Sequence, residues 1–183
     1  MLRSLFIYLS KAAWARKLVT QWKFAWRAAS RFVAGEKLED AIRVIQELNQ
    51  KGINATLDHL GEHTTSAEDA NRATQDILEA LDAIQKTGVR ANVSIKLTQI
   101  GMALGDEVCF QNLRRILEYA RERDNFIRID MEDSACVDQT LRLFFRMRKE
   151  CDCSNVGIVI QSYLYSSAED IKAILADGGR VRL

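Results

Sequence analysis

Polar side chains interrupt five apolar runs near the end of each run, and these residues are the best suited to chemistry. They are Asp58, Lys96, Asp130, Gln161 and Arg182. A charged or amide group in an apolar context costs free energy unless it is paired or used. A single example is more often a structural ion pair, whereas five in succession indicate a site. Lys96, Asp130 and Arg182 could bind a small anion or neutralise one another, and the sequence leaves both interpretations open.

The stretch DHLGEH brings Asp58, His59, Glu62 and His63 together, which are residue types that bind metal ions. Two histidines four positions apart share a face only on a helix, but this stretch follows a strand pattern and contains Gly61. We therefore expect no metal.

The cysteines offer no alternative chemistry. Cys109, Cys136, Cys151 and Cys153 show no paired metal spacing, and neither a serine nor a cysteine stands in a nucleophile elbow. We expect these thiols to be reduced.

The elements that must position the polar residues alternate along the chain. A first helix is predicted at 37–50. Strands are predicted at 53–60, 91–99, 126–131 and 156–164, with a fifth beginning at 180, and helices at 66–86, 107–123, 134–150 and 167–179. Ser66 and Ser167 are expected to open two of these helices, while Glu132 and Asp133 are expected in a loop and helix cap.

Strict alternation of strand and helix predicts an α/β fold with a parallel sheet and right-handed crossovers. No glycine-rich phosphate loop follows the first strand, which favours a (β/α)8 TIM-type barrel over a doubly wound sheet. A typical barrel needs eight strands and about 250 residues. We therefore expect the N-terminal part of a longer protein, with four to five β/α units. Residues 1–50 would form a helical segment, and 51–183 a partial barrel truncated in strand five.

The composition, with 48% hydrophobic and 28% charged residues and a net charge of +1, is that of a soluble globular protein without a nucleic-acid partner. No apolar run reaches the roughly 18 residues of a membrane span. Residues 1–34 are nevertheless basic and aromatic at helical spacing, with seven Lys or Arg and no acidic residue. This segment is read either as a helix packed on the domain or as a weak anchor on an anionic membrane surface.

Six motifs, in order, resemble the bacterial monofunctional proline dehydrogenases, which are flavin enzymes on a distorted (β/α)8 barrel. The motifs are RFVAGE, ATLDHLGEHTTS, SIKLTQIG, RIDMEDS, VIQSYLY and RVRL. The resemblance implies FAD-dependent oxidation of L-proline to 1-pyrroline-5-carboxylate, the first step of proline degradation to glutamate, with electrons passed to quinone. It also implies a cytoplasmic protein, peripheral on the inner face of the cell membrane.

The resemblance assigns roles to several of these residues. Lys96 would contact the substrate carboxylate, and Asp130 and Arg182 would be the active-site pair.

Met131 and Gln161 would contact FAD. Glu62 would pair with arginines that family members carry later in the chain, and Asp58 would support the site. Ser166 departs from the arginine that is expected after YLY.

Two alternatives stay open. The chain could be a non-catalytic truncated fragment that cannot close a barrel, or a flavin-free barrel enzyme that acts on a small carboxylate. We expect the isolated 183 residues not to oxidise proline.

Overall fold

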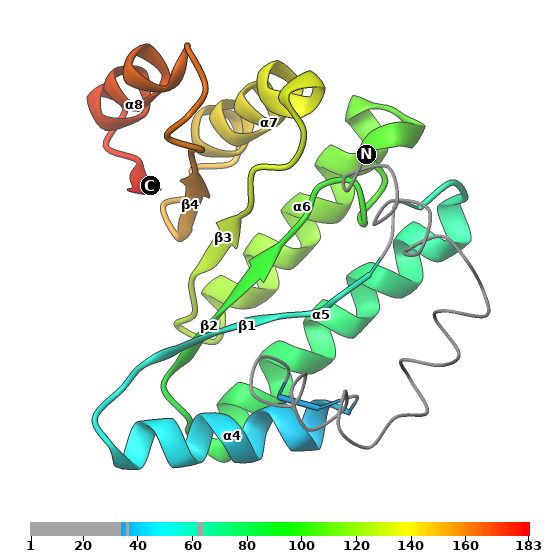
Figure 1. Ribbon diagram of the computed structural model, residues 1–183. Helices are drawn as coiled ribbons and strands as arrows, with labels where there is room; N and C mark the ends of the chain where they lie inside the picture. The colour runs from blue at the N-terminus through cyan, green and yellow to red at the C-terminus, as the bar shows by residue number, and fades with distance from the viewer. Residues whose placement is uncertain (1–33, 36, 62–63) are drawn as a thin grey trace, which may run out of the picture. The chain divides into compact units, whose positions relative to one another are not determined.

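The computed structural model describes residues 34, 35, 37–61 and 64–183 (Figure 1). The chain divides into two compact units between Val44 and Ile45, within helix α4 (Leu38–Gln50). The second unit contains the sheet and the residues discussed below. The predicted membrane segment lies outside the described residues apart from Ala34, and the predicted domain boundary at residue 50 stays a prediction.

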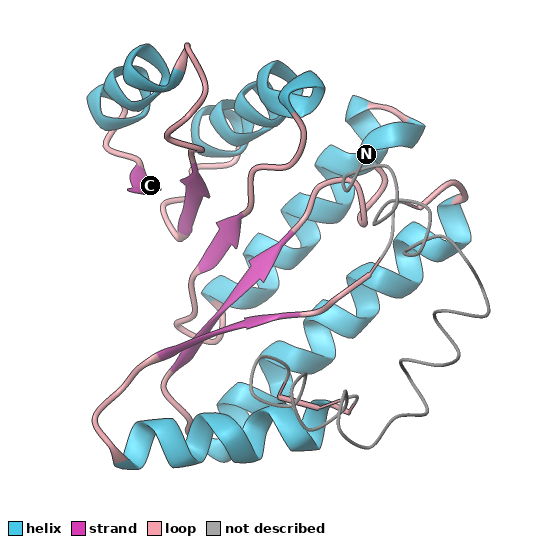
Figure 2. Cartoon of the chain, in the orientation of Figure 1, coloured by secondary structure: helices cyan, strands magenta, loops and turns pink. Residues whose placement is uncertain are grey.

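In the described residues a parallel five-stranded sheet follows the order β1-β2-β3-β4-β5 (Figure 2). The strands are β1 (Ala55–Asp58), β2 (Ala91–Ile95), β3 (Ile127–Ile129), β4 (Val156–Val159) and β5 (Arg180–Arg182). Each strand pairs with the next one along the chain. A doubly wound sheet reverses its strand order at a switch point, whereas this sheet keeps one direction throughout. The predicted α/β fold is confirmed, and the order is that of a partial (β/α)8 barrel.

A helix connects each pair of successive strands. These helices are α5 (Ala67–Thr87), α6 (Asp106–Arg121), α7 (Val137–Glu150) and α8 (Ser167–Ala176). Short 3-10 turns at Met102–Leu104 and Ser134–Cys136 precede α6 and α7. Among the described helices, none is both long and apolar enough to cross a membrane.

Serine capping was predicted correctly for one helix and wrongly for another. The Ser66 Oγ accepts a hydrogen bond from the Asp69 N–H at 3.1 Å, which caps α5 as predicted. At α8, however, Ser166 takes the cap position and makes no capping bond with its side chain. Ser167 lies inside the helix, where its buried hydroxyl donates to the backbone oxygens of Gln161 and Leu164. Two upstream carbonyls therefore bind the serine that was expected to cap the helix.

The two faces of the sheet differ in chemistry because successive strand residues point to opposite sides. The apolar face carries residues that are at most 1% exposed: Val93, Ile95, Ile127, Ile129, Val156 and Ile158. The opposite face is mostly polar and includes Thr56, Asp58, Asn92, Ser94, Arg128, Asp130, Arg180 and Arg182. The strands thus bury one face as a core and present polar groups on the other.

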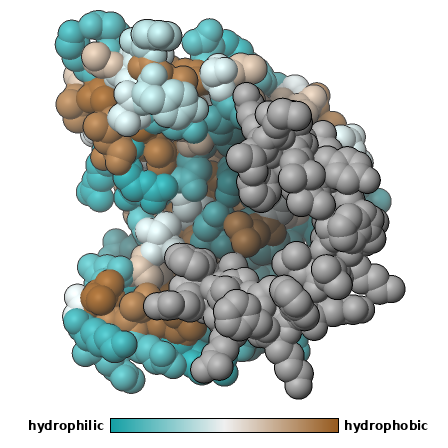
Figure 3. Space-filling view, in the orientation of Figure 1, coloured by the Kyte–Doolittle hydropathy of each residue, from teal (hydrophilic) through white to brown (hydrophobic). Residues whose placement is uncertain are grey.

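The described residues seen in Figure 3 form a mainly hydrophilic surface with apolar patches among them. Such a surface is expected for a chain in which 28% of the residues are charged.

The segment after β2 is a buried loop. Residues 97–102 are all buried, although connecting segments usually run over the surface. Buried backbone groups need partners, and this loop obtains several from nearby elements. The Leu97 oxygen accepts from the Met102 N–H at 3.0 Å, and the Ile100 oxygen accepts from the Asn112 side chain at 2.9 Å. Strand β2 was predicted to reach residue 99, but the chain leaves the sheet after Ile95 to form this loop.

Candidate active site

The first ion pair of the site joins two neighbouring strand ends. Asp58 is the last residue of β1, and Lys96 directly follows β2. The Lys96 Nζ lies 2.9 Å from the Asp58 Oδ2, and both side chains are half-buried. A lysine ammonium has three N–H donors, so one bond to Asp58 leaves it able to bind a second anion.

The second ion pair joins β3 and β5. Asp130 follows β3, and its Oδ1 accepts a hydrogen bond from the Arg182 Nη2 at 2.8 Å. The Asp130 side chain is 19% exposed and the Arg182 side chain 44%. The backbone N–H of Asp130 also donates to the Ile95 oxygen at 2.8 Å, which fixes the carboxylate next to the end of β2.

The structure therefore divides the predicted cluster of Lys96, Asp130 and Arg182 into two pairs. Within the described residues Lys96 pairs with Asp58, and no ion pair joins it to Asp130. All four side chains belong to the carboxyl ends of parallel strands, which is the edge where barrel enzymes place their active sites.

Gln161 and Met131 are in direct contact. The Gln161 Nε2 donates to the Met131 backbone oxygen at 3.3 Å, while the Gln161 Oε1 accepts from the Tyr163 hydroxyl at 3.1 Å. Met131 is buried and Tyr163 is exposed. Both ends of the Gln161 amide thus have a partner, and the Ser167 hydroxyl donates to the Gln161 backbone oxygen.

Positive charge gathers on the polar face of the sheet beside Asp130. Burial lowers the pKa of the Arg128 guanidinium, and the charge of Arg182 lowers it further, while Asp130 acts in the opposite direction. An arginine stays protonated in proteins, so the charge persists. Arg128 and Arg180 both lie over the Phe126 ring, at 5.5 and 5.0 Å from its centroid. This face favours an anionic group.

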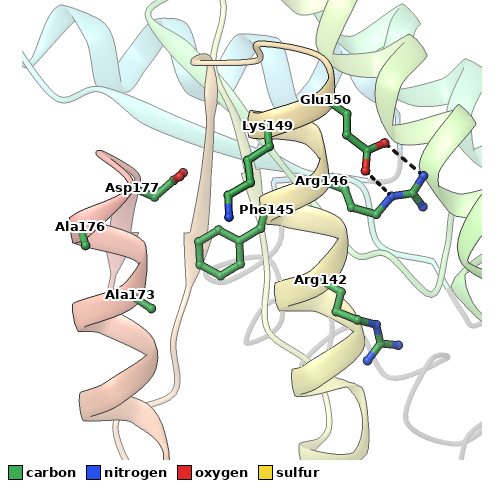
Figure 4. A pocket seen from close by; sticks show the side chains of 8 residues that line it. All are labelled: Arg142, Phe145, Arg146, Lys149, Glu150, Ala173, Ala176 and Asp177. Carbon is green, nitrogen blue, oxygen red and sulfur yellow. Dashed lines mark hydrogen bonds and ion pairs between the residues drawn. The ribbon is translucent and has the colours of Figure 1, made fainter.

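A cavity of about 690 Å³ lies elsewhere, between α7 and α8 (Figure 4). Arg142, Phe145, Arg146 and Lys149 of α7 line it, and Figure 4 shows Arg146 bound to Glu150 along the same helix. None of the strand-end residues described above contributes to its lining. This cavity is therefore separate from the candidate active site, despite its size.

The sequence matches a known family over most of its length. The family model described as "Proline dehydrogenase" matches residues 41–181. The chain belongs to the proline dehydrogenase family. The resemblance inferred from the six motifs is confirmed.

Relatives within the proline dehydrogenase family are longer than this chain. Proline dehydrogenase 1 of Bacillus subtilis is 38% identical over 175 residues, covering 94% of this chain and 56% of the relative. Proline dehydrogenase of Deinococcus radiodurans is 40% identical over 148 residues, covering 79% and 48%. The chain thus spans about half the length of the curated relatives it matches.

A solved structure supports the fold. Proline utilization A from Bdellovibrio bacteriovorus, inactivated by N-propargylglycine, superposes with a TM-score of 0.73 at 23% identity. The superposition covers 81% of this chain and 19% of that chain.

Two predicted features fall on residues that the structure does not describe. Glu62 and His63 are both outside the described ranges. The supporting role of Glu62 and the absence of a metal stay predictions.

Glu132 is a polar residue of the site whose contacts the sequence reasoning missed. It lies in the loop after β3, as predicted, and its carboxylate binds both the backbone N–H and the hydroxyl of Thr98, on the loop after β2. One signal could have revealed it: residues two apart in an extended chain point the same way, and Glu132 follows Asp130 by two.

Proposed function

We propose that the protein carrying this chain oxidises L-proline to 1-pyrroline-5-carboxylate with FAD as cofactor. One observation carries the proposal: a chain of the proline dehydrogenase family places two ion pairs, Asp58–Lys96 and Asp130–Arg182, at the carboxyl ends of its strands. Relatives that are 38% and 40% identical are named proline dehydrogenases.

Lys96 is proposed to bind the substrate carboxylate. Its pairing with Asp58 holds the ammonium at the strand ends and leaves donors for a second carboxylate. Proline carries one carboxylate, so a point charge at this position would anchor the ring and fix its orientation.

Arg182 and Asp130 are proposed to set the charge beside the reacting carbon. FAD, when bound, supplies the hydride acceptor for oxidation of the secondary amine. Arg182 keeps its charge throughout, and the 2.8 Å contact with Asp130 fixes the direction of its guanidinium. A preorganised positive group favours negative charge that develops during the reaction.

The residues present fit a flavin. Gln161 offers a donor and an acceptor on one amide, which matches the mixed donors and acceptors on the pyrimidine edge of the ring. Its Oε1 partner is the exposed Tyr163, which can give way to a ligand. Gln161 and Met131 are therefore the residues that we assign to FAD binding.

We further propose that the electrons pass to a quinone and that residues 1–34 bring the protein to the membrane. The seven basic residues and the absence of acidic ones in this segment suit an anionic lipid surface. The protein would then be cytoplasmic and peripheral on the inner face of the cell membrane. Deletion of residues 1–34 should lower the fraction bound to vesicles of anionic lipid, and unchanged binding would remove this part of the proposal.

The decisive experiment is the visible absorption spectrum of the protein that carries this chain, before and after anaerobic addition of L-proline. Flavin absorption that bleaches with proline supports cofactor, substrate and reaction together. A protein that stays colourless after FAD is added contradicts the proposal and favours a flavin-free barrel enzyme.

The same substitution at two lysines, one inside the proposed site and one outside it, provides a test with a matched control. Lys96→Met should raise the proline concentration needed for bleaching, because it removes the cation proposed to bind the carboxylate. Lys149→Met removes the same charge from the α7 cavity and should leave bleaching unchanged. The expectation that the isolated 183 residues do not oxidise proline stays a prediction, and turnover by them would refute it.

A further inference from the structure

Thr98 is the centre of a hydrogen-bond cluster that ties three loops together. Its backbone N–H and its hydroxyl both donate to the Glu132 carboxylate, at 3.2 and 2.5 Å. Its backbone oxygen accepts from the N–H and the hydroxyl of Thr64, at 3.2 and 3.0 Å. Thr98 is 4% exposed and Thr64 is 9% exposed, so the bond between them is buried, while the bonds to Glu132 are part-buried.

These contacts come from the loops that follow β1, β2 and β3. Thr64 follows β1, Thr98 follows β2 and Glu132 follows β3. The same three strand ends carry Asp58, Lys96 and Asp130. The cluster therefore joins the segments that directly follow three residues of the proposed site.

The Glu132 carboxylate extends the pairing of β2 and β3 beyond the end of the sheet. The ladder pairs Ile95 with Ile129, and the Asp130 N–H then donates to the Ile95 oxygen. Beyond this bond, no backbone–backbone bond joins the described residues that follow β2 to those that follow β3. The next link between them is the bond from the Thr98 N–H to the Glu132 carboxylate. Lys96 lies two residues before Thr98, and Asp130 lies two residues before Glu132. Each is therefore held by the sheet on its N-terminal side and by the Thr98–Glu132 contact on its C-terminal side.

We propose that Glu132 and Thr98 are positioning residues, which hold Lys96 and Asp130 at the separation that the substrate requires. Neither residue touches the reacting atoms in this assignment, because both act through the backbone of the strand ends. The inference rests on the proposed function, since it concerns the same site. Buried polar groups that support a site in this way hold its side chains in the productive geometry.

Two disruptive and two conservative substitutions separate positioning from simple stability. Glu132→Ala leaves the Thr98 N–H buried without its acceptor, and Thr98→Val removes the hydroxyl at nearly constant shape. Glu132→Gln keeps an acceptor for the N–H and a donor for the hydroxyl, because a threonine hydroxyl can also accept. Thr98→Ser keeps the hydroxyl. The conservative variants should behave like the parent protein.

The first measurement is amide hydrogen exchange of Thr98 and Thr64 in the full protein that carries this chain. Glu132→Ala should speed exchange at both amides by about 100-fold, as expected when a buried contact opens locally. Unchanged protection in Glu132→Ala overturns the inference, whatever becomes of the proposed function.

The second measurement separates KM from kcat for L-proline. Glu132→Ala and Thr98→Val should raise KM by about 10-fold with a smaller change in kcat, and Glu132→Gln and Thr98→Ser should restore it. Lost protection with an unchanged KM overturns the positioning role. If the parent protein exchanges slowly at Thr98 but neither binds flavin nor oxidises proline, the proposed function fails and the positioning role falls with it.

Asn155 supplies a structural control. Its side chain donates to the backbone oxygens of Leu117 and Asn125, beside the amino ends of β3 and β4. Asn155→Ala removes a comparable pair of side-chain contacts at the opposite end of the strands. It should lower the melting temperature and leave the KM for proline unchanged, and an equal rise in KM would show that general destabilisation explains the Glu132 and Thr98 variants.

Discussion

Replacing Asp130 with alanine should damage activity far more than stability. The substitution removes the 2.8 Å contact with the Arg182 guanidinium. Because 44% of the Arg182 side chain is exposed, solvent screens the pair, and its contribution to folding should be only about 1 kcal/mol. A loss of that size lowers the melting temperature by roughly 2–4 °C in a protein of about 150–250 residues, and by less in a longer one.

In the proposed role of this pair the cost to catalysis should be larger, because the same contact fixes the direction of the Arg182 guanidinium. Loss of one preorganised electrostatic group in an active site typically costs about 100-fold in rate, or roughly 2.7 kcal/mol. We therefore expect kcat/KM for L-proline to fall by about 100-fold in Asp130→Ala. Arg182→Ala should cause a similar fall, and the double variant should be little worse than either single variant, because the two residues act as a unit.

The assay combines thermal melting with steady-state kinetics, and Asp82→Ala is its matched control. Asp82 also accepts from an arginine, with its Oδ1 2.9 Å from the Arg123 Nε, but it lies on helix α5. This control should lower the melting temperature and leave kcat/KM unchanged. A fall of less than threefold for Asp130→Ala, or strictly additive effects of Asp130→Ala and Arg182→Ala, would refute the reasoning.

Three further predictions concern the fold. Gly157→Ala should destabilise the protein by about 1–3 kcal/mol in urea unfolding, because the new Cβ would lie 2.6 Å from the Phe126 Cζ; an unchanged midpoint would contradict this. Burial raises the pKa of Cys109 from 9.0 to about 12, so the unfolded chain loses this proton first. Between pH 9 and 12 the free energy of unfolding should therefore fall by up to about 1.4 kcal/mol per pH unit, and Cys109→Ala should remove that slope in urea titrations. Ser66→Ala should lower the free energy of unfolding by about 1 kcal/mol, because it removes the acceptor of the Asp69 N–H. Ser66→Asn keeps an acceptor at this position and should retain most of that stability in the same assay.

The order of strands and helices could be predicted from the sequence because it depends on local periodicity. The contacts between side chains depend on strand register, which the sequence pattern does not contain. Lys96 bonds to Asp58 because their strands are neighbours in one particular register. Ser167 resembles a helix cap in sequence, yet the turn after β4 brings two carbonyls to its hydroxyl.

The loop after β2 explains another limit of the sequence prediction. Its apolar residues continue the strand pattern past Ile95, although the backbone has already left the sheet. In a continued strand the Thr98 N–H would be expected to pair with a backbone oxygen, so the prediction of a longer strand did not reveal that it binds the Glu132 carboxylate.

The burial of residues 97–102 also bears on how this protein can diverge. Loops at the carboxyl ends of barrel strands are where related enzymes commonly gain insertions and new specificities. A loop that is buried and bonded on several sides cannot lengthen without stranding polar backbone groups. The turn after β4 is also held at the Gln161 and Leu164 oxygens, but Tyr163 and Tyr165 in the same turn are exposed and free to change. Sequence drift and laboratory selection for new substrates should therefore alter the turn after β4 while the loop after β2 keeps its length.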